Sequence, residues 1–383
     1  MDWSFLIRNK SSLNVTTDSR KVTPGSVFVA LKGEHFDGND FVEQARRDGA
    51  EYIISGENAL TELQDLARAW RRELGLPILG ITGTNGKTTT KELCAAVLST
   101  KYNLYYTQGN LNNQLGVPLT VLSITRAHEM AIVEMGASHP GDIKELVEIA
   151  EPNYGLITNV GKAHLQGFGS FEGVQRTKAE LYDYLRAHGG LCFRNTDNPY
   201  LAKMAGDLKT VAYQTGTMPE GTHLVGAYNA ENVSAAICVG EYFGVSREEA
   251  LAAIRAYIPS NNRSQLMQTE RNTLVVDAYN ANPTSMQAAI NAFKGNCYIL
   301  GAMRELGDYE HLEHQNIVNM LLERKADTVL LVGPEYKETT APYPIFENVQ
   351  SLCEHLAKKP LTGYHILLKG SRSNQLEKLI PYL

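Results

Sequence analysis

The stretch Gly80–Lys91, GITGTNGKTTTK, constrains the fold of this chain more than any other segment. The apolar run LPILGIT suits a buried strand, and TTTKELCAAVLST after it has the apolar spacing of a helix, so the glycines occupy a strand-to-helix turn. The first N–H groups of a helix lack internal partners, and the helix dipole adds positive charge there. Such an end binds anions, so a phosphate chain is the expected occupant.

The glycine loop has its own spacing. A standard P-loop reads G-x-x-x-x-G-K-[ST], whereas Ile81 stands five residues before Gly86, so the motif here is the tighter GTNGKT from Gly83 to Thr88. Its glycines let the backbone approach phosphates closely, Lys87 neutralises the outer ones, and the Thr88 hydroxyl suits a magnesium ion. The alternative is a glycine turn that caps an ordinary helix, with Lys87 in solvent.

The chain is organised as three successive α/β segments. Its 383 residues are enough for two or three domains. Residues 1–76 have a strand–helix–strand rhythm and end in a helix before a proline. Apolar strands alternate with helices over residues 77–258, which is typical of a mostly parallel sheet. A second series of buried strands over residues 259–383 predicts an open doubly wound, Rossmann-like domain, so the fold class is α/β with a central P-loop domain.

Composition excludes several classes of protein. A net charge of −6 argues against broad electrostatic binding of nucleic acid or of an anionic membrane. The start MDWSFLIRNK has too short an apolar stretch for a secretory signal, and no apolar run is long enough to span a bilayer, so we expect a cytoplasmic protein. The cysteines are odd in number and form no C-x-x-C pair, which indicates small core residues rather than disulfides or a zinc site.

Polar residues at the ends of the predicted strands carry the chemistry. Glu134 follows the strand MAIVEM, where a carboxylate can hold the magnesium that Thr88 touches; the alternative is a strand-end carboxylate in water. Asn159, Lys162 and His164 follow the strand YGLITNV, at the edge where open α/β sheets bind ligands. A lone histidine is nevertheless more often structural than a metal ligand.

Two further groups are candidates. Lys178 lies in the helix RTKAELYDYL, and by residue type alone it is a solvated surface charge. Asp277, Tyr279, Asn280 and Asn282 crowd the end of a strand in VVDAYNANPTSM. Their amides and carboxylate suit a ribose, a base or a phosphate.

Several long motifs, in the same order, resemble the Mur ligase family of peptidoglycan synthesis. They are GTNGKTTTKE, GNLNNQLGVPLT, EMGASHPGDI, NVGKAHLQGFGS, DAYNANPTSM and LLKGSRS. The similarity runs from TTDSRKVTPGSVFVALKGEHFDG to the C-terminal KGSR, which is nearly the whole chain. The resemblance implies a three-domain Mur ligase architecture in which residues 1–76 bind the UDP-linked substrate, residues 77–258 bind ATP and residues 259–383 bind the amine substrate.

The resemblance also implies a reaction. In this family ATP phosphorylates the terminal carboxylate of a UDP-linked peptide, and an amine attacks the acyl phosphate through a tetrahedral intermediate, with Mg²⁺ assisting. The motifs are most similar to those of members that join D-alanyl-D-alanine to UDP-N-acetylmuramoyl-tripeptide, so ATP and these two molecules are the expected substrates. We expect an ADP-forming acid–amino acid ligase of cell wall biogenesis that is a monomer and binds neither nucleic acid nor membrane.

Site residues carry over from the family only to positions that match its motifs. Lys87, His164 and Lys178 are catalytic by resemblance, and Lys178 matches a lysine whose carbamylation turns it into a carboxylate-like anion. The expected ATP-binding residues are Gly83, Thr84, Asn85, Gly86, Lys87, Thr88, Thr89, Asn232, Arg263, Asp277, Asn280 and Asn282. The expected metal ligands are Thr88, Glu134, His164 and Lys178. The expected substrate-binding residues are Ser19, Arg20 and Lys32 for uridine diphosphate, Asn112 and Asn113 for the muramyl peptide, and Lys369, Ser371 and Arg372 for the dipeptide carboxylate.

The chain departs from the family pattern in places, and rival functions remain. Tyr228 stands where relatives often have histidine, Ala302 stands where aspartate is common, and the segment between Asn195 and Gly226 is shorter than in relatives. Another Mur-type amino acid ligase is one alternative, although the DNPR-like motif of the diamino-acid-adding members is missing. Folylpolyglutamate synthetase lacks an N-terminal UDP-binding domain of this kind. A further alternative is an inactive protein that binds UDP-muramyl peptides. The joint presence of the five expected catalytic and metal-binding residues argues against it; they are Lys87, Thr88, Glu134, His164 and Lys178.

Overall fold

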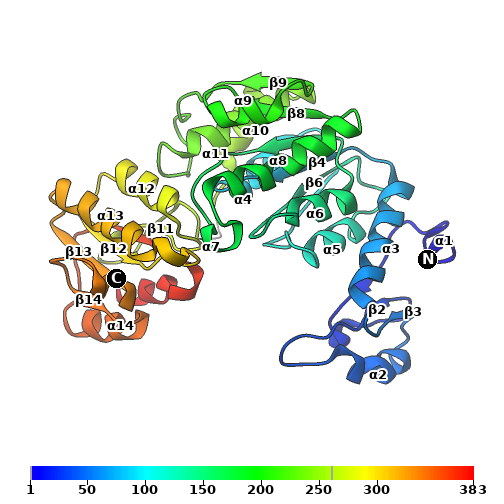
Figure 1. Cartoon of the computed structure of the whole chain (residues 1–383), viewed down its shortest axis with the longest axis horizontal. Coiled ribbons are helices and arrows are strands. Elements are labelled where there is room, and N and C mark those ends of the chain that lie inside the picture. The colour runs from blue at the N-terminus through cyan, green and yellow to red at the C-terminus, as the bar shows by residue number, and fades with distance from the viewer. Residues whose placement is uncertain (1, 260–261) are drawn as a thin grey trace.

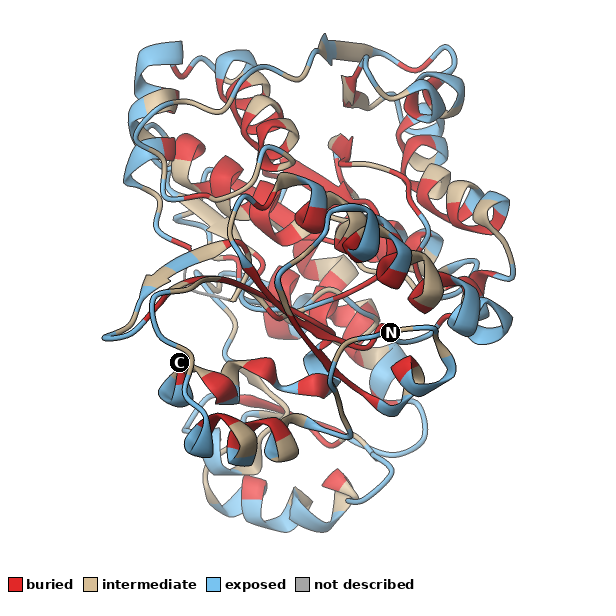
Figure 2. Ribbon diagram, turned by 90° about the vertical axis from the view of Figure 1, so that its left-hand side faces the viewer, coloured by how far each residue is buried: buried red, intermediate tan, exposed pale blue. Residues whose placement is uncertain are grey.

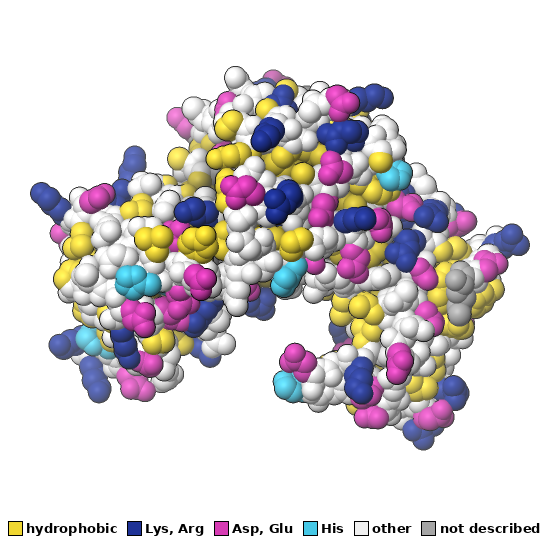
Figure 3. Space-filling model, viewed as in Figure 1, with side chains coloured by type: hydrophobic (Ala, Val, Ile, Leu, Met, Phe, Trp, Pro, Cys, Tyr) yellow, Lys and Arg dark blue, Asp and Glu magenta, His cyan; other side chains and the backbone are white. Residues whose placement is uncertain are grey.

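The computed structural model describes residues 2–259 and 262–383, and within them the strands form three separate sheets. Helices pack against each sheet, so the α/β fold class predicted from the sequence is confirmed. Figure 1 shows the unit with the first sheet and the unit with the third sheet on opposite sides of the central body. A wide opening separates these two outer units, and the space-filling view in Figure 3 shows it too.

The first sheet is small and parallel, in the order β1–β2–β3. Its strands are β1 (Val15–Thr16), β2 (Val27–Val29) and β3 (Tyr52–Ile54), and its helices are α1 (Ser4–Ile7), α2 (Val42–Arg47) and α3 (Ala59–Leu74). The strand–helix–strand rhythm predicted here is confirmed, although β1 was not predicted. Helix α3 is capped at its C-terminal end by Gly75, which has a left-handed φ of 63° that favours glycine.

The central sheet has parallel strands in the order β5–β6–β4–β7–β8–β9. The strands are β4 (Ile78–Thr82), β5 (Leu104–Tyr106), β6 (Met130–Glu134), β7 (Tyr154–Ile157), β8 (Leu191–Asn195) and β9 (Thr210–Tyr213). The helices are α4 (Lys87–Leu98), α5 (Gly116–Leu122), α6 (Asp142–Ala150), α7 (Leu165–Phe168), α8 (Phe171–Ala187), α9 (Pro199–Ala205), α10 (Asn229–Tyr242) and α11 (Arg247–Ala256). The edge strands β5 and β9 were not predicted.

Both faces of the central sheet are buried. Side chains alternate along a strand, so β4 sends Ile78 to one hydrophobic cluster and Leu79 and Ile81 to the other. Helices α5, α6 and α8 cover the first face, and α4, α10 and α11 cover the second. Figure 2 shows the buried strands between these helix layers. Continuous apolar strands such as ILGIT are typical of a parallel sheet enclosed in this way.

Helix α3 joins the first unit to the central one. Trp70 is fully buried and donates from Nε1 to the Ile124 carbonyl at 2.8 Å. Arg71, also buried, donates from Nε to the Ala150 carbonyl and from Nη2 to the Glu151 carbonyl, both at 2.9 Å. One hydrophobic cluster contains residues of β2, α3, α5 and α6. The first unit therefore shares a core with the central sheet.

The third sheet has the order β10–β11–β15–β12–β13–β14, and only β10 runs antiparallel to its neighbour. Its strands are β10 (Gln265–Gln268), β11 (Thr273–Asp277), β12 (Cys297–Gly301), β13 (Thr328–Val332), β14 (Ile345–Phe346) and β15 (His365–Lys369). Helices α12 (Pro283–Ala292) and α13 (Glu310–Glu323) cover one face, and α14 (Val349–Lys358) covers the other. The four interior strands were predicted, whereas the short edge strands β10 and β14 were not.

The cysteines confirm the expectation of core residues. All are free thiols; Cys238 is half-buried and the others are buried. Burial raises the pKa of the Cys297 thiol to about 12, which keeps it protonated. No helix in the described part of the chain is long and apolar enough to cross a membrane.

Candidate functional site

A cavity of about 790 Å³ lies between the carboxyl ends of the central strands and the third sheet. Parallel α/β sheets bind ligands at this edge. The sequence-predicted residues that line it are Thr84, Asn85, Gly86, Lys87, Thr88, Thr89, Asn112, Asn113, Glu134, Asn159, His164, Asn232, Arg263, Asp277, Tyr279, Asn280 and Lys369. Those that do not line it are Ser19, Arg20, Lys32, Gly83, Lys162, Lys178, Asn282, Ser371 and Arg372.

The turn between β4 and α4 has the backbone of a phosphate-binding loop. Gly83 and Gly86 have φ angles of 142° and 77°, in a region that residues with a Cβ rarely adopt. A Cβ on Gly86 would also collide with the Asn232 side chain. Lys87, the first residue of α4, folds back and donates from Nζ to the carbonyls of Gly83 at 2.8 Å and Thr84 at 3.1 Å.

The Lys87 ammonium lies in an environment that disfavours its charge. Burial lowers the pKa of Lys87 to about 8, and the nearby Arg263 cation acts in the same direction against the attraction of Glu134. A negative group beside Lys87 favours the charged form. The loop is therefore matched to an anion such as a phosphate.

Glu134 ends β6 and is buried beside the P-loop. Its Oε1 accepts hydrogen bonds from Thr88 Oγ1 at 3.2 Å and from Asn112 Nδ2 at 2.8 Å. Its Oε2 is buried without a hydrogen bond, 3.8 Å from the Lys91 Nζ. Buried carboxylate oxygens usually have partners, so this oxygen has free capacity to bind a cation.

Thr88 and Glu134 fit a magnesium ion. Both offer hard oxygen donors, which Mg²⁺ prefers, and Mg²⁺ is usually held by one or two protein groups together with phosphate oxygens and water. The described residues contain no cluster of three or more His, Cys, Asp or Glu side chains that would hold a metal alone. A magnesium ion held by Thr88 and Glu134 would therefore need further ligands, such as phosphate oxygens and water.

His164 and Lys178 lie at different depths near this cavity. His164 has a left-handed φ of 49°, and its Nδ1 contacts Glu305 Oε2 of the third unit. Burial lowers the pKa of His164 against the attraction of Glu305. Lys178 on α8 is only 2% exposed, so the alternative of a solvated surface charge is wrong. Its ammonium lies 5.6 Å from the centroid of the Phe168 ring, and burial, reinforced by Lys87, lowers the pKa of Lys178 well below its usual range.

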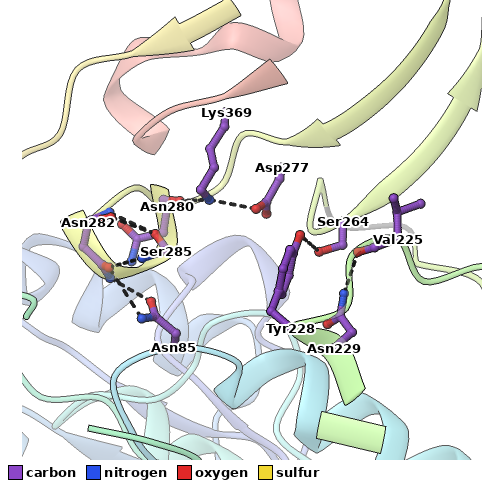
Figure 4. A network of polar contacts seen from close by, with 10 residues as sticks. All are labelled: Asn85, Val225, Tyr228, Asn229, Ser264, Asp277, Asn280, Asn282, Ser285 and Lys369. Carbon is purple, nitrogen blue, oxygen red and sulfur yellow. Dashed lines mark hydrogen bonds and ion pairs between the residues drawn. The ribbon is translucent and has the colours of Figure 1, made fainter. Parts of the chain in front are cut away.

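Figure 4 shows the polar contacts that cross from the central unit to the third. Asn282 Nδ2 donates to Asn85 Oδ1 in the P-loop at 2.7 Å. Arg263 precedes β10, and its guanidinium carbon lies 3.8 Å from the centroid of the Tyr279 ring. The Arg263 Nε is buried without a hydrogen-bond partner. Arg263 also lines the cavity, so it places a guanidinium cation there, as a site for an anion requires.

The side chains of Asn232, an expected ATP-binding residue, and Tyr228 are already engaged with the protein. Asn232 Oδ1 accepts from Thr90 Oγ1 at 3.0 Å, and its Nδ2 donates to Asn229 Oδ1 at 2.9 Å. Tyr228, which replaces the histidine common in relatives, lines the cavity, and its hydroxyl is 2.7 Å from Ser264 Oγ. This position therefore connects α10 to the segment that enters the third unit.

The residues expected at the dipeptide carboxylate are dispersed. Lys369 Nζ forms an ion pair with Asp277 Oδ2 at 2.7 Å. Ser371 is buried, and its Oγ donates to Asn374 Oδ1 within its own turn at 2.7 Å. Arg372 is exposed and donates from Nη1 to the Tyr279 hydroxyl at 3.4 Å. Of these three, only Lys369 lines the cavity.

The residues expected to bind uridine diphosphate lie in the first unit, away from the cavity. Arg20 pairs with Asp18 at 2.9 Å, and its side chain is 87% exposed. Lys32 pairs with Asp37 at 3.7 Å and is also mostly exposed. Ser19 begins the short 3-10 helix that contains Arg20.

Sequence reasoning missed several residues of the cavity wall. They are Asn110, Gln114, Ser138, His139, Asp142, Asn198, Asn229, Glu231, Ser264, Thr284, Ser285 and Glu305. Asp142 and His139 belong to the quoted motif EMGASHPGDI, and Glu231 precedes Asn232, so motif membership was an available signal. Glu305 offered none, because it is 141 residues from its partner His164.

In the central unit, the first strand of a parallel sheet leads through a glycine loop into a helix. This arrangement defines the P-loop class of proteins. Comparison with known families is more specific: residues 13–96 match the Mur ligase family catalytic domain, residues 81–218 the Mur ligase middle domain and residues 262–372 the Mur ligase glutamate ligase domain. The UDP-N-acetylmuramoyl-tripeptide–D-alanyl-D-alanine ligase of Bacillus subtilis (strain 168) is 34% identical, over 96% of this chain and 92% of its own length. The chain belongs to the Mur ligase family.

Solved structures give the same result. MurF ligase from Thermotoga maritima, in complex with ADP, aligns with a TM-score of 0.86 and 27% identity over 98% of both chains. MurF from Acinetobacter baumannii aligns with a TM-score of 0.84 and 28% identity, over 96% of this chain and 92% of its own. The three-domain Mur ligase architecture predicted from the motifs is confirmed.

Proposed function

We propose that this protein is an ATP-dependent ligase that adds D-alanyl-D-alanine to UDP-N-acetylmuramoyl-tripeptide, a step of peptidoglycan precursor synthesis. Relatives named UDP-N-acetylmuramoyl-tripeptide–D-alanyl-D-alanine ligase match nearly the whole chain. The observation that carries the proposal is the convergence of Lys87, Thr88, Glu134 and His164 on one cavity, which Arg263 enters from the opposite unit. These groups come from separate strand ends, and together they suit phosphoryl transfer between two bound substrates.

The first step makes an acyl phosphate. A terminal carboxylate oxygen of the peptide attacks the γ-phosphorus of ATP, and the bond to the β-phosphate oxygen breaks to release ADP. Lys87 and the first N–H groups of α4 neutralise the outer phosphates, and the Arg263 guanidinium adds positive charge from the other side of the cavity. Thr88, Glu134 and His164 would hold magnesium, which supplies further neutralisation of phosphate charge when bound.

The second step makes the amide. The neutral amine nitrogen of the dipeptide attacks the acyl carbon and loses a proton, and the tetrahedral intermediate collapses with loss of inorganic phosphate. Because the cavity has walls from both the central and third units, it can shield the acyl phosphate from water until the amine arrives. Asn112 and Asn113, which belong to the motif GNLNNQLGVPLT, line the cavity. We place the acceptor peptide beside them.

Lys178 fits a carbamate in this proposal. Its low pKa makes the neutral amine accessible, and this amine adds to carbon dioxide with loss of a proton. The product is an anion with oxygen donors, which a buried cation site favours. The proposal also includes the expected division of labour, with residues 1–76 on the UDP moiety, 77–258 on ATP and 259–383 on the dipeptide, and a monomer that acts in the cytoplasm.

A coupled assay tests the function. The purified protein receives ATP, UDP-N-acetylmuramoyl-tripeptide and one amine from a panel, and phosphate release and product mass are measured. We expect turnover with D-alanyl-D-alanine that requires both other substrates. Preferential use of D-glutamate, glutamate or a free diamino acid would assign another ligase of the family. Binding of the UDP-peptide without turnover of any amine would assign an inactive binding protein.

A further inference from the structure

Lys369 is paired within its own sheet. It ends β15 in register with Asp277, the last residue of the adjacent strand β11. Its side chain is 2% exposed; Nζ is 2.7 Å from Asp277 Oδ2 and donates to the Asn280 carbonyl at 3.1 Å. Both bonds go to the segment 277–282, and the one to the Asp277 carboxylate neutralises the ammonium charge locally. A further anion, such as a peptide carboxylate, gains little from an ammonium in this state.

The segment 277–282 also positions Arg263. The Ala278 N–H donates to the Asn262 carbonyl at 3.0 Å, and the Tyr279 ring lies against the Arg263 guanidinium at 3.8 Å. Arg263 is the cavity residue with a buried, unpaired Nε. Movement of the segment would therefore move the cation that faces the nucleotide side of the cavity.

The far end of the segment contacts the P-loop. Asn282 is the N-cap of α12, and its Oδ1 accepts from Ser285 N at 2.9 Å, which fixes the side chain. Its Nδ2 then donates to Asn85 Oδ1 at 2.7 Å. Asn85 is itself held from the central sheet, since its N–H donates to Asn159 Oδ1 at 3.0 Å and its carbonyl accepts from Thr158 Oγ1 at 2.6 Å.

Figure 4 shows Lys369 bonded to Asp277 and Asn280 at one end of this arrangement, and Asn282 bonded to Ser285 and Asn85 at the other. We propose that Lys369 is a positioning residue that fixes segment 277–282, and through it Arg263 and the P-loop contact, in the geometry for nucleotide binding. The sequence led us to expect that Lys369 binds the dipeptide carboxylate, and the positioning role replaces that expectation. The inference rests on the proposed function for the identity of the dipeptide. The effect of Lys369 on ATP binding does not depend on that identity.

The variant Lys369→Met separates the two roles. Dissociation of a non-hydrolysable ATP analogue is measured by calorimetry, hydrogen exchange is measured over residues 278–285, and kinetics compare D-alanyl-D-alanine with its C-terminal amide. We expect weaker nucleotide binding and a lower kcat, each by about tenfold to a hundredfold, as for residues that orient others. Exchange in the segment should quicken, while the preference for the free carboxylate stays at the wild-type ratio.

Two results would overturn the proposal. Loss of the preference for the free carboxylate makes Lys369 a dipeptide ligand, and unchanged nucleotide affinity and exchange make the ion pair merely structural. Lys337→Met is the matched control, because Lys337 pairs with Glu347 on the exposed surface of the same unit, and it should leave every measurement unchanged. If the wild-type protein uses a different amine, the proposed function is refuted. The measurements of nucleotide affinity and hydrogen exchange would still test the positioning role.

If Lys369→Met does not fold, Asp277→Asn decides. This variant keeps an oxygen acceptor and removes the neutralising charge, so the Lys369 ammonium keeps its position but loses its counter-charge. A role as dipeptide ligand predicts a lower KM for D-alanyl-D-alanine, because the ammonium is released to bind the carboxylate. The positioning role predicts a KM equal to or above that of the wild type. A lowered KM would therefore contradict it.

Discussion

Lys178 is the residue for which the chemistry expected from residue type differs most from the chemistry that its surroundings in the structure indicate. In the sequence it is one helix lysine among many, and in the structure it is buried near Lys87 with an aromatic ring as its neighbour. A buried ammonium group is costly unless it is paired, and burial, reinforced by Lys87, lowers the pKa of this one well below its usual range. A carbamate would convert this unfavourable cation into an anion suited to a metal-containing site.

We expect Lys178→Ala to lose activity by about a hundredfold or more, since one anionic group of the metal site would be missing. Binding of ATP should persist, because the contacts of Lys87 and the loop N–H groups remain. Acetate or formate should restore part of the turnover by occupying the vacated space, and methylamine should not. Lys144→Ala, an exposed position on the neighbouring helix α6, serves as the control. Wild-type turnover of Lys178→Ala, or rescue by amines, would refute the carbamate.

Helix α13 depends on a neutral histidine in its buried face. His314 is fully buried; its Nε2 accepts from the Met303 N–H at 3.1 Å, and its Nδ1 donates to the Glu310 carbonyl at 2.7 Å. Only the neutral imidazole can both accept and donate in this way. Burial accordingly lowers the pKa of His314. The histidine thus joins α13 to the segment that follows β12.

This histidine makes the stability of the third unit pH-dependent. Below the unfolded-state pKa of about 6.5, the unfolded chain binds a proton that the folded chain does not, so stability falls as the pH falls. The slope contributed by one such group reaches about 1.4 kcal/mol per pH unit. Urea unfolding at pH 7.5 and 5.5 measures it. His314→Gln should reduce the difference between the two values, whereas His35→Gln, in an exposed loop, should leave it unchanged.

Polar contacts near the cavity join the central unit to the third unit. Lys162 Nζ lies 3.0 Å from Glu313 Oε1, and the Glu313 side chain is 1% exposed whereas that of Lys162 is 54% exposed. The Lys162 N–H also donates to Thr284 Oγ1 at 3.1 Å. These contacts hold the loop after β7, which carries His164, against α12 and α13.

Lys162→Met should loosen this arrangement, because it leaves Glu313 buried without its cation. The cost of an unpaired buried charge is about 1–3 kcal/mol after allowance for the exposure of Lys162. Small-angle scattering with a bound ATP analogue should show a larger radius of gyration than for the wild type. The charge exchange Lys162→Glu with Glu313→Lys should restore part of the difference. An unchanged radius in the single variant would show that the pair does not hold the two units together.

Most of the fold and part of the site could be predicted because they depend on nearby residues. The interior strands of the central and third sheets are continuous apolar runs, and they were found. The edge strands β1, β5, β9, β10 and β14 are short and partly exposed, so they lack that signal. Their positions depend on pairing with a neighbour that the local sequence does not reveal.

The sequence by itself determined the glycine loop, the helix that follows it and the meeting of Thr88 with Glu134. A left-handed glycine turn is encoded within a few residues, and parallel strands bring their carboxyl ends to one edge. The tertiary structure alone decided that Lys178 is buried, that His164 meets Glu305 and that Lys369 is neutralised by Asp277, 92 residues away. The physical reason is that a charged side chain carries its charge in the sequence, whereas its partner and its exposure to water arise only when distant segments pack together.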